Sequence, residues 1–526
     1  MTRRAIEADV CVIGSGISAA MVADKLARET KKTIVVVEAG DDALPMAARG
    51  GARERFLGYG ENPWPNDHLD GLDVDGPLQS RSMLVGGLAM HWGGVTPRFA
   101  PDDFRHRTIF GVGDDWPISY DDLDPFYQEA EELMGVAGEQ GPRAMDPRSK
   151  PFPLPALPLT YNLGLLKEWA SKAGIATWSQ PSAKASAAYR GRPACCRNDT
   201  CTPICPIGAK YSPDMTWQPL RSANRIRLVT RTIIRRLVLD RSSGRISHAI
   251  GLDRARPNEQ VEFHAKQFVV AGGYAWSSHL LLLSAQAGAD SGIANRSGLV
   301  GKYLTGHRNV QAYVSLPLRL FPGINEQHSL LSKQFMRATG GDFIRHDLRI
   351  WESASGKGPR LKNDAGAVML GDEILTDWRQ RSATGVARVR SYYDVLPDRS
   401  SELTLDATRK TPWGDPLPKL AFRDAPASVA LRARTEEKIR AVFQDLARAG
   451  NGQVIRTATD NFQDHPAGGC RMGDDAAASV VDSWGRTHDH ENLFVVGAPT
   501  CVSGSCANAT LTFCALALRS ALEIAK

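Results

Sequence analysis

Residues 8–19 read ADVCVIGSGISA, and this stretch decides the fold. It begins with a short, mostly apolar run typical of a buried parallel strand and then turns at Gly14-Ser15-Gly16. Apolar residues recur at helical spacing from Ile17 to Arg28, and a second β-branched run covers Thr33–Val37. A strand, a glycine turn, a helix and another strand form the first unit of a Rossmann-type sheet, so the sequence predicts an α/β protein.

The glycine turn matches the dinucleotide-binding fingerprint G-x-G-x-x-[GA]. Gly14 permits the tight turn, Gly16 lets a pyrophosphate approach the backbone, and the small Ala19 allows the helix to pack closely on the strand. Glu38 closes the second strand, where a carboxylate binds ribose hydroxyls. An acid at this position disfavours a 2′-phosphate. The motif alone is compatible with both FAD and NAD, and a glycine-rich turn without a nucleotide is the alternative.

Length and charge exclude several classes of protein. With 526 residues, the chain is expected to form two or three interwoven domains. The net charge of +6 is weak for this length, and the absence of a Lys/Arg block argues against nucleic-acid binding. No apolar run reaches the roughly 18 residues of a membrane span. An apolar export segment does not follow Arg3-Arg4, so a cytoplasmic location is expected.

The C-terminal region repeats the pattern of the first unit. An apolar strand over Asn492–Val496 runs into Gly497-Ala498-Pro499, and after a polar loop a helix is predicted over Thr510–Ile524. A chain that returns to its first domain near its end is common among flavoproteins and unusual among small NAD dehydrogenases. The return therefore favours FAD.

Three further segments carry a family resemblance. Residues 85–94, VGGLAMHWGG, resemble the flavin-contacting loop of the glucose–methanol–choline (GMC) oxidoreductases, and residues 465–473, HPAGGCRMG, resemble their catalytic-histidine segment. Residues 508–512, NATLT, take the place of the family's second catalytic residue. With the fingerprint, four motifs follow the family's order along nearly the whole chain. Within the family, the sequence resembles the large subunits of FAD-dependent sugar dehydrogenases (glucose dehydrogenase and glucoside 3-dehydrogenase) and pyranose 2-oxidase.

The resemblance implies FAD-dependent oxidation of a hydroxyl of a sugar or glycoside to the carbonyl. It makes His465 the base that accepts the hydroxyl proton while hydride leaves to flavin N5, with Asn508 as its partner. An imidazole titrates near working pH, and an amide can hydrogen-bond the substrate oxygen without competing for the proton. Gly497-Ala498 departs from the aspartate that many members have there. The implied cofactor-binding residues are Gly14, Gly16, Ala19, Glu38, Gly86, Gly87, His91, Trp92, Gly93, Gly497, Ala509 and Thr510.

His91 has two interpretations. The matching histidine of pyranose 2-oxidase is covalently joined to FAD, so the resemblance implies such a link. The alternative is a histidine that packs against the isoalloxazine without a bond, as in related dehydrogenases.

Four of the nine cysteines lie close together, at Cys195, Cys196, Cys201 and Cys205. Dense thiolates with a trailing Cys-Pro are typical of iron–sulfur ligation. Zinc sites usually have paired C-x-x-C knuckles or histidines, and a disulfide is the alternative in an oxidising compartment. The segment resembles the stretch that holds a three-iron cluster in the sugar dehydrogenase large subunits. That resemblance implies Cys196, Cys201 and Cys205 as ligands, with Cys195 able to substitute.

A cluster at this site implies a dehydrogenase that passes electrons to an external, cytochrome-type acceptor. Related large subunits work with a small subunit that carries the export signal, which would place the enzyme in the periplasm. An oxygen-using pyranose or glycoside oxidase, and an oxidoreductase that tailors a sugar-containing natural product, are the enzymatic alternatives. A binding protein built on a decayed flavin fold is the alternative from another class, and a flavin-free purified protein would favour it.

These segments give a domain division. The FAD-binding domain is expected in three parts, over residues 1–120, 226–307 and 456–526, and its last part carries the catalytic residues. A helical and cysteine-rich insertion covers 121–225, and an antiparallel (α+β) substrate-binding domain covers 308–455. Residues 41–117 are rich in glycine and proline and are predicted to form long ordered loops.

Overall fold

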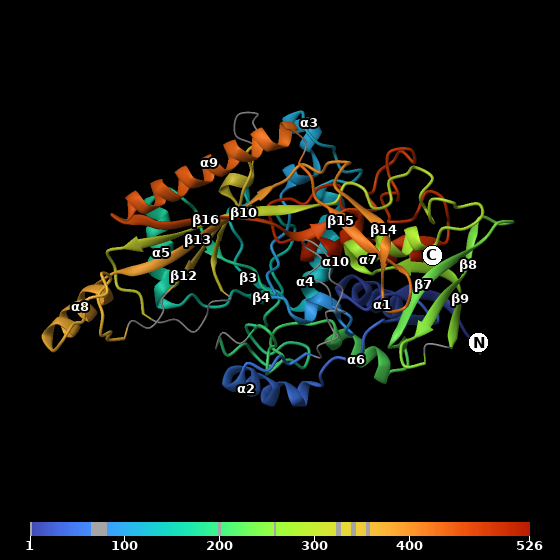
Figure 1. Ribbon diagram of the computed structural model, residues 1–526, viewed down its shortest axis with the longest axis horizontal. Coiled ribbons are helices and arrows are strands. Elements are labelled where there is room, and N and C mark those ends of the chain that lie inside the picture. Colours follow the sequence, from blue (N-terminus) through green and yellow to red (C-terminus); the bar gives the residue numbers. More distant parts are fainter. Residues whose placement is uncertain are drawn as a thin grey trace.

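The computed structural model describes residues 3–64, 82–197, 201–256, 259–321, 328–337, 343–353, 358–424 and 426–526 (Figure 1). The α-helices are α1 (Ile17–Glu29), α2 (Arg49–Tyr59), α3 (His106–Phe110), α4 (Tyr120–Met134), α5 (Tyr161–Lys172), α6 (Asp214–Ser222), α7 (Gly273–Leu283), α8 (Asp372–Ala383), α9 (Pro426–Ala449) and α10 (Thr510–Ala525). In the described part of the chain, none of the helices combines the length and the apolar character needed to cross a membrane.

The strands form two large sheets and two small pairs. They are β1 (Arg3–Ile13), β2 (Ile34–Val37), β3 (Ala137–Gly138), β4 (Leu154–Pro155), β5 (Trp178–Ser179), β6 (Arg227–Val229), β7 (Thr232–Asp240), β8 (Arg245–Asp253), β9 (Gln260–Val270), β10 (Thr305–Leu316), β11 (Leu330–Ser332), β12 (Leu348–Glu352), β13 (Gly385–Asp394), β14 (Glu402–Lys410), β15 (Pro416–Ala421), β16 (Gln453–Ala467) and β17 (Leu493–Val495).

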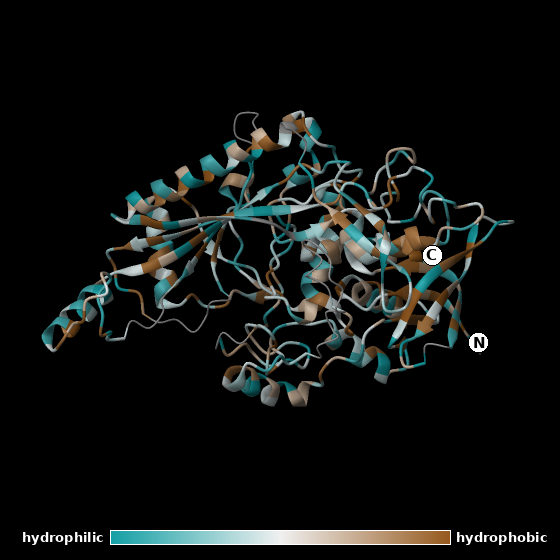
Figure 2. Ribbon diagram, viewed as in Figure 1, coloured by the Kyte–Doolittle hydropathy of each residue, from teal (hydrophilic) through white to brown (hydrophobic). Residues whose placement is uncertain are grey.

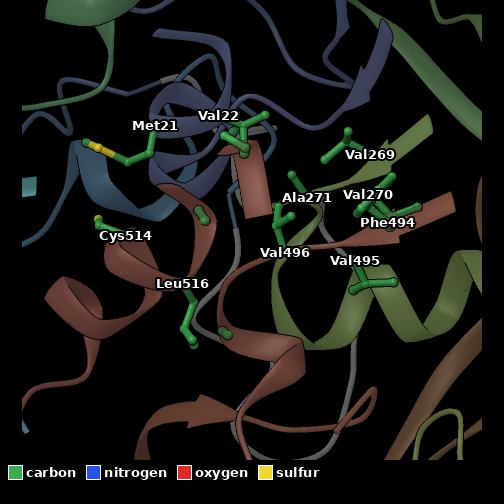
Figure 3. Close-up of a cluster of buried hydrophobic side chains, with 14 of the residues drawn as sticks. Met21, Val22, Val269, Val270, Ala271, Phe494, Val495, Val496, Cys514 and Leu516 are labelled. Carbon is green, nitrogen blue, oxygen red and sulfur yellow. The ribbon is translucent and has the colours of Figure 1, made fainter. Parts of the chain in front are cut away.

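The first sheet is of Rossmann type and has the order β6-β2-β1-β9-β8-β7, with β17 paired to β9. The pairs β1–β2, β2–β6, β1–β9 and β17–β9 are parallel, and β7 and β8 form an antiparallel hairpin beside β9. Both β1 and β17 therefore pair with the same central strand, although they lie near opposite ends of the sequence. Figure 3 shows how side chains of α1, β9, β17 and α10 fill the core beside it.

The second sheet is antiparallel and has the order β16-β10-β13-β12-β11-β5. Apolar and polar side chains alternate along its strands, so that one face of the sheet is apolar. This face packs on α5 and α9, and the shared core includes Val310, Val389, Ile439 and Phe443. The other face carries polar side chains. Figure 2 shows hydrophobic and hydrophilic residues mixed along these strands. The predicted fold class, a Rossmann-type domain combined with an antiparallel sheet, is confirmed.

One local prediction was wrong. Residues 41–117 were expected to be loops, but they contain α2 and α3, and residues 65–81 lie outside the described residues. Helix α2 has poor helix formers in its first turn, and buried contacts hold it instead. Arg49 pairs with Asp214 at 2.6 Å, and Arg53 donates to the carbonyl of Thr202. Tertiary contacts therefore override a sequence that resembles a loop.

Candidate active site

A cavity of about 550 Å³ runs from the fingerprint turn of the first sheet to the end of β16 in the second. Among the predicted site residues, those lining it are Gly14, Gly16, Glu38, Gly87, Trp92, Gly93, His465, Asn508 and Thr510. The structure thus brings together residues from all four sequence motifs. Predicted residues that do not line it are Ala19, Gly86, His91, Gly497 and Ala509.

The fingerprint end of the cavity fits a dinucleotide. Gly14 has a φ of +100°, and a Cβ there would lie 2.7 Å from the carbonyl oxygen of Ala271, so a larger residue is excluded. A Cβ on Gly16 would meet nothing within 4 Å, which leaves open space beside the N-terminus of α1. A pyrophosphate can occupy such a space and accept bonds from the helix N–H groups.

Glu38 holds the turn in place. Its carboxylate accepts hydrogen bonds from the backbone N–H of Ser15 at 3.0 Å and of Gly40 at 2.7 Å. Burial raises the pKa of Glu38 above its ordinary value, and these hydrogen bonds oppose that shift. Glu38 also lines the cavity, at the position where the fingerprint motif places a ribose.

The predicted residues outside the lining support those inside it. The N–H of Gly86 donates to the hydroxyl of Ser15 at 3.1 Å, and a Cβ on Gly497 would lie 2.2 Å from the hydroxyl of Ser18. The His91 ring packs edge-on against Trp64 with 4.8 Å between ring centroids, and its Nε2 lies 3.4 Å from the hydroxyl of Ser82. A bond between His91 and FAD stays a prediction.

The two predicted catalytic residues are in contact. Asn508 Nδ2 donates to His465 Nε2 at 2.9 Å, and the Asn508 Oδ1 is buried without a hydrogen-bond partner among the described residues. An orphaned buried oxygen costs free energy unless a bound molecule satisfies it. The position of Asn508 therefore fits a site that is completed by a cofactor or substrate.

A third residue, His307 of β10, was not predicted and fixes the tautomer of His465. The His307 Nδ1 lies 3.2 Å from the carbonyl oxygen of Ser505, which can only accept, so Nδ1 carries the hydrogen. The His307 Nε2 is then an acceptor, and it lies 2.8 Å from His465 Nδ1. His465 must donate from Nδ1, and its lone pair is at Nε2, where it accepts the hydrogen bond from the Asn508 amide.

Burial and charge keep His465 neutral. Burial, followed by the nearby guanidinium groups of Arg349 and Arg390, lowers the pKa of His465 from 6.5 to about 3. The backbone φ of His465 is +49°, an uncommon value for a residue other than glycine. Such strain persists where surrounding contacts impose it, and it occurs often at functional sites. The imidazole is thus held as a neutral base in a fixed orientation.

This lowered pKa predicts a pH dependence. The folded state binds the His465 proton less readily than the unfolded state, whose imidazole has a pKa of 6.5. The stability contributed by the neutral ring is present above pH 6.5 and is lost as the pH falls toward 3. We expect the unfolding temperature to decrease over this range, and the decrease to be smaller in His465→Gln. Equal decreases in the two proteins would contradict the assignment.

The cysteine loop, here residues 195–197 and 201–205, lies beside the cavity. Cys201 and Cys205 are buried, Cys195 is half-buried and Cys196 is exposed, and all four thiols are free. The ammonium group of the buried Lys210 donates to the carbonyl oxygens of Trp92 and, at 2.7 Å, Cys201. One lysine therefore bridges the cysteine loop and a residue of the cavity lining.

Metal-ligating groups are close together at another place. Among the described residues, the ligand atoms of Asp103, His106 and Asp394 lie within 4.8 Å of one another. Arg345 lies among them, 2.6 Å from Asp103, 3.0 Å from Asp394 and 2.9 Å from His106. Its guanidinium supplies the positive charge that this cluster needs.

Comparisons with known proteins identify the family. Models described as GMC oxidoreductase match residues 183–309 and 397–517. The chain is 30% identical to the fructose dehydrogenase large subunit of Gluconobacter japonicus, over 99% of this chain and 98% of the relative. This protein is a GMC oxidoreductase. It is also 29% identical to paromamine 6′-oxidase of Streptomyces fradiae, over 98% of this chain and 91% of that protein.

The fold of this GMC oxidoreductase agrees with solved structures. Pyridoxine 4-oxidase from Mesorbium loti superimposes with a TM-score of 0.64 at 16% identity, covering 98% of each chain. The C-terminal family match contains both His465 and Asn508, and the N-terminal match contains the cysteine loop and His307. The protein is an FAD-dependent oxidoreductase that acts on CH–OH donors.

Proposed function

We propose that this GMC oxidoreductase is a dehydrogenase that oxidises a hydroxyl of a sugar or glycoside to the carbonyl. The observation that carries the proposal is the His465 Nε2 lone pair, held beside Asn508 in the cavity that contains the fingerprint turn. The names of two relatives, a fructose dehydrogenase subunit and a paromamine oxidase, favour a carbohydrate substrate.

The residues of the cavity have separate roles. The substrate hydroxyl takes the place of the Asn508 amide at His465 Nε2 and gives its proton to this nitrogen. The displaced Asn508 amide then donates a hydrogen bond to the substrate oxygen and orients it. Bound FAD supplies the acceptor for the hydride. Burial and the guanidinium groups of Arg349 and Arg390 disfavour an imidazolium at His465 and lower its pKa, so the ring is neutral and can accept a proton when the substrate binds.

An anaerobic titration tests this proposal. The purified holoenzyme is mixed with pyranoses, glycosides and simple alcohols while the absorbance of oxidised flavin is followed. Bleaching by sugars or glycosides and not by simple alcohols is the expected result, and bleaching by simple alcohols alone would overturn it. Rapid reoxidation of the reduced flavin by air would favour the oxidase alternative over the dehydrogenase.

We also propose that Cys195, Cys201 and Cys205 hold an iron–sulfur cluster of the three-iron type. Burial is the main cause of a raised pKa of the Cys195 thiol, and Cys201 and Cys205 are near enough to raise it further. The exposed Cys196 fits less well than Cys195 as the first ligand. The four thiols, all among the described residues, form no group tight enough to share one ion. Separate irons of a cluster allow the wider spacing.

The charge around the cysteine loop fits the same proposal. Lys184 and Lys210 are both buried there, and burial lowers the pKa of Lys210 to about 8 while Cys201 and Cys205 counter the shift. Cations beside thiolates offset the negative charge of a cluster. A cluster bound there supplies one-electron transfer to an acceptor outside the chain, such as a cytochrome-type protein or a partner small subunit.

Replacing Cys201 with serine is expected to remove most of the iron and acid-labile sulfide, because one of three thiolate ligands is lost. Flavin bleaching by substrate should persist in this variant, since the proton-accepting residues are unchanged. Iron analysis of the purified protein measures the effect. Cys196→Ser is the matched control and should keep its iron. Loss of iron in Cys196→Ser and not in Cys195→Ser would restore the set of ligands predicted from the sequence.

A further inference from the structure

The polar face of the second sheet carries an unusual number of arginines. Strand alternation and register place Arg349 of β12 directly beside Arg390 of β13, and Arg388 lies two positions along the same face. His307 lies on this face of β10, since the register pairs it with Asp394 of β13. The face that carries His307, the hydrogen-bond partner of His465, therefore also carries a group of guanidinium ions.

Tyr392 connects the arginines to the catalytic base. Its ring lies 5.9 Å from the His465 ring and 4.2 Å from the His307 ring. The Arg390 guanidinium stacks over the same tyrosine at 4.2 Å, and Arg349 lies at 5.5 Å from it. A single aromatic ring thus separates the two guanidinium groups from the site of proton removal.

The positive charge on this face is not fully balanced. Arg349 pairs with Asp347 at 2.7 Å and donates to Gln180, but its Nη2 is buried and has no hydrogen-bond partner in the described part of the chain. Arg390 has no ion pair among the described residues, and its Nε is likewise buried and unpartnered. Unpaired buried donors are costly, so they indicate a missing acceptor.

We propose that Arg390 and Arg349 bind an anionic group of the substrate, a carboxylate or a phosphate. This inference rests on the proposed function and narrows its substrate class to sugar acids, sugar phosphates or glycosides with an acidic group. The planar guanidinium matches the oxygen geometry of both anions. The neighbouring Trp351, 4.8 Å from Arg390 and 5.4 Å from Arg388, holds both side chains by cation–π contact. The anion then lies across Tyr392 from the hydroxyl that His465 deprotonates.

Anaerobic flavin reduction in the holoenzyme tests the substrate class. Glucose, glucuronate, glucose 6-phosphate and glucosamine differ mainly in charge and serve as the probes. The two anionic sugars are expected to have an apparent Kd about 10-fold lower than that of glucose, and the cationic amino sugar the highest. Glucuronate and glucose 6-phosphate distinguish a carboxylate site from a phosphate site. Equal Kd values for glucose and both anions would overturn the proposal.

Substitution of Arg390 locates the anion. Arg390→Gln is expected to raise the Kd of the preferred anionic sugar about 10-fold and to leave the Kd of glucose unchanged. Arg456→Gln is the matched control, because Arg456 stacks on Tyr313 at the far end of the same sheet face and is exposed. An equal loss of affinity for glucose and for the anionic sugars in Arg390→Gln would indicate a structural role for Arg390 and overturn the proposal.

Calorimetric titration separates this proposal from the proposed function. It is carried out on the His465→Ala holoenzyme, in which binding is read without turnover. In one outcome, no sugar reduces the wild-type flavin, but an anionic sugar binds tightly and Arg390→Gln abolishes this binding. That outcome would reject the oxidation proposal alone. Oxidation of neutral sugars with no charge preference in either measurement would reject the anion site alone.

Discussion

Replacing His465 with alanine is expected to lower the rate constant for flavin reduction by substrate about 10²- to 10⁴-fold, the usual contribution of a general base. The Nε2 lone pair of His465 is oriented by the His307 hydrogen bond and by Asn508. Water in the vacated space cannot replace it, because its position is not fixed. Stopped-flow absorbance under anaerobic conditions, at saturating substrate, measures the rate constant directly.

The FAD content of the His465→Ala protein provides the control. The fingerprint turn and the residues that hold it lie at the other end of the cavity, so the variant should purify with a normal amount of flavin. Asn508→Ala should show a smaller loss of rate, since it removes an orienting contact and leaves the base in place. A rate constant in His465→Ala within a few-fold of wild type would show that another group accepts the proton.

Local patterns predict the parts of the fold that local forces determine. The helix expected over residues 17–28 is α1, Ile17–Glu29, and the helix expected over 510–524 is α10, Thr510–Ala525. Both have sustained apolar spacing, and α1 also follows a glycine turn, which are strong signals within one segment. Strand β17 was predicted as well, but its pairing with β9 beside β1 is a long-range property that the C-terminal segment alone does not contain.

The hydrogen-bonded group of His307, His465 and Asn508 could be predicted only in part. His465 and Asn508 lie in recognisable motifs, whereas His307 lies in a strand without one. Its contact with His465 depends on the pairing of β10 with β16, whose register shifts on both sides of His307. A register irregularity arises from packing between strands that are far apart in sequence. The arginines on the polar face of the second sheet could not be predicted for the same reason, since their proximity depends on the alignment of β12 with β13.

The cysteine loop shows the limit of spacing arguments. Cys195 and Cys196 are adjacent, so their spacing to Cys201 and Cys205 differs by one residue only. In the structure Cys196 is exposed, whereas Cys195 is half-buried near Cys201 and Cys205, and this difference is the reason to propose Cys195 as the first ligand. A choice between adjacent residues of the same type needs the fold of the loop, which the sequence pattern does not specify.

Replacing His307 with leucine is expected to lower the rate constant for flavin reduction about 10- to 100-fold, through loss of a hydrogen bond worth about 1.5–3 kcal/mol to the developing imidazolium. Leucine removes the acceptor for the Nδ1 hydrogen of His465, which lies 2.8 Å from His307 Nε2. The ring can then place its hydrogen on Nε2, the atom that must accept the substrate proton. Water cannot replace the lost acceptor, because the position of His307 is fully buried.

The conservative variant His307→Gln separates positioning from packing. A glutamine carbonyl can accept from His465 Nδ1, and its amide can donate to the Ser505 carbonyl that His307 contacts at 3.2 Å. This variant should therefore retain most of the rate, whereas both variants alter the packing against Tyr392, 4.2 Å from the His307 ring. The apparent Kd of the substrate should change little in either protein, since His307 acts through His465. Equal loss of rate in His307→Leu and His307→Gln, or a loss confined to Kd, would show that His307 shapes the site and does not set the tautomer of its base.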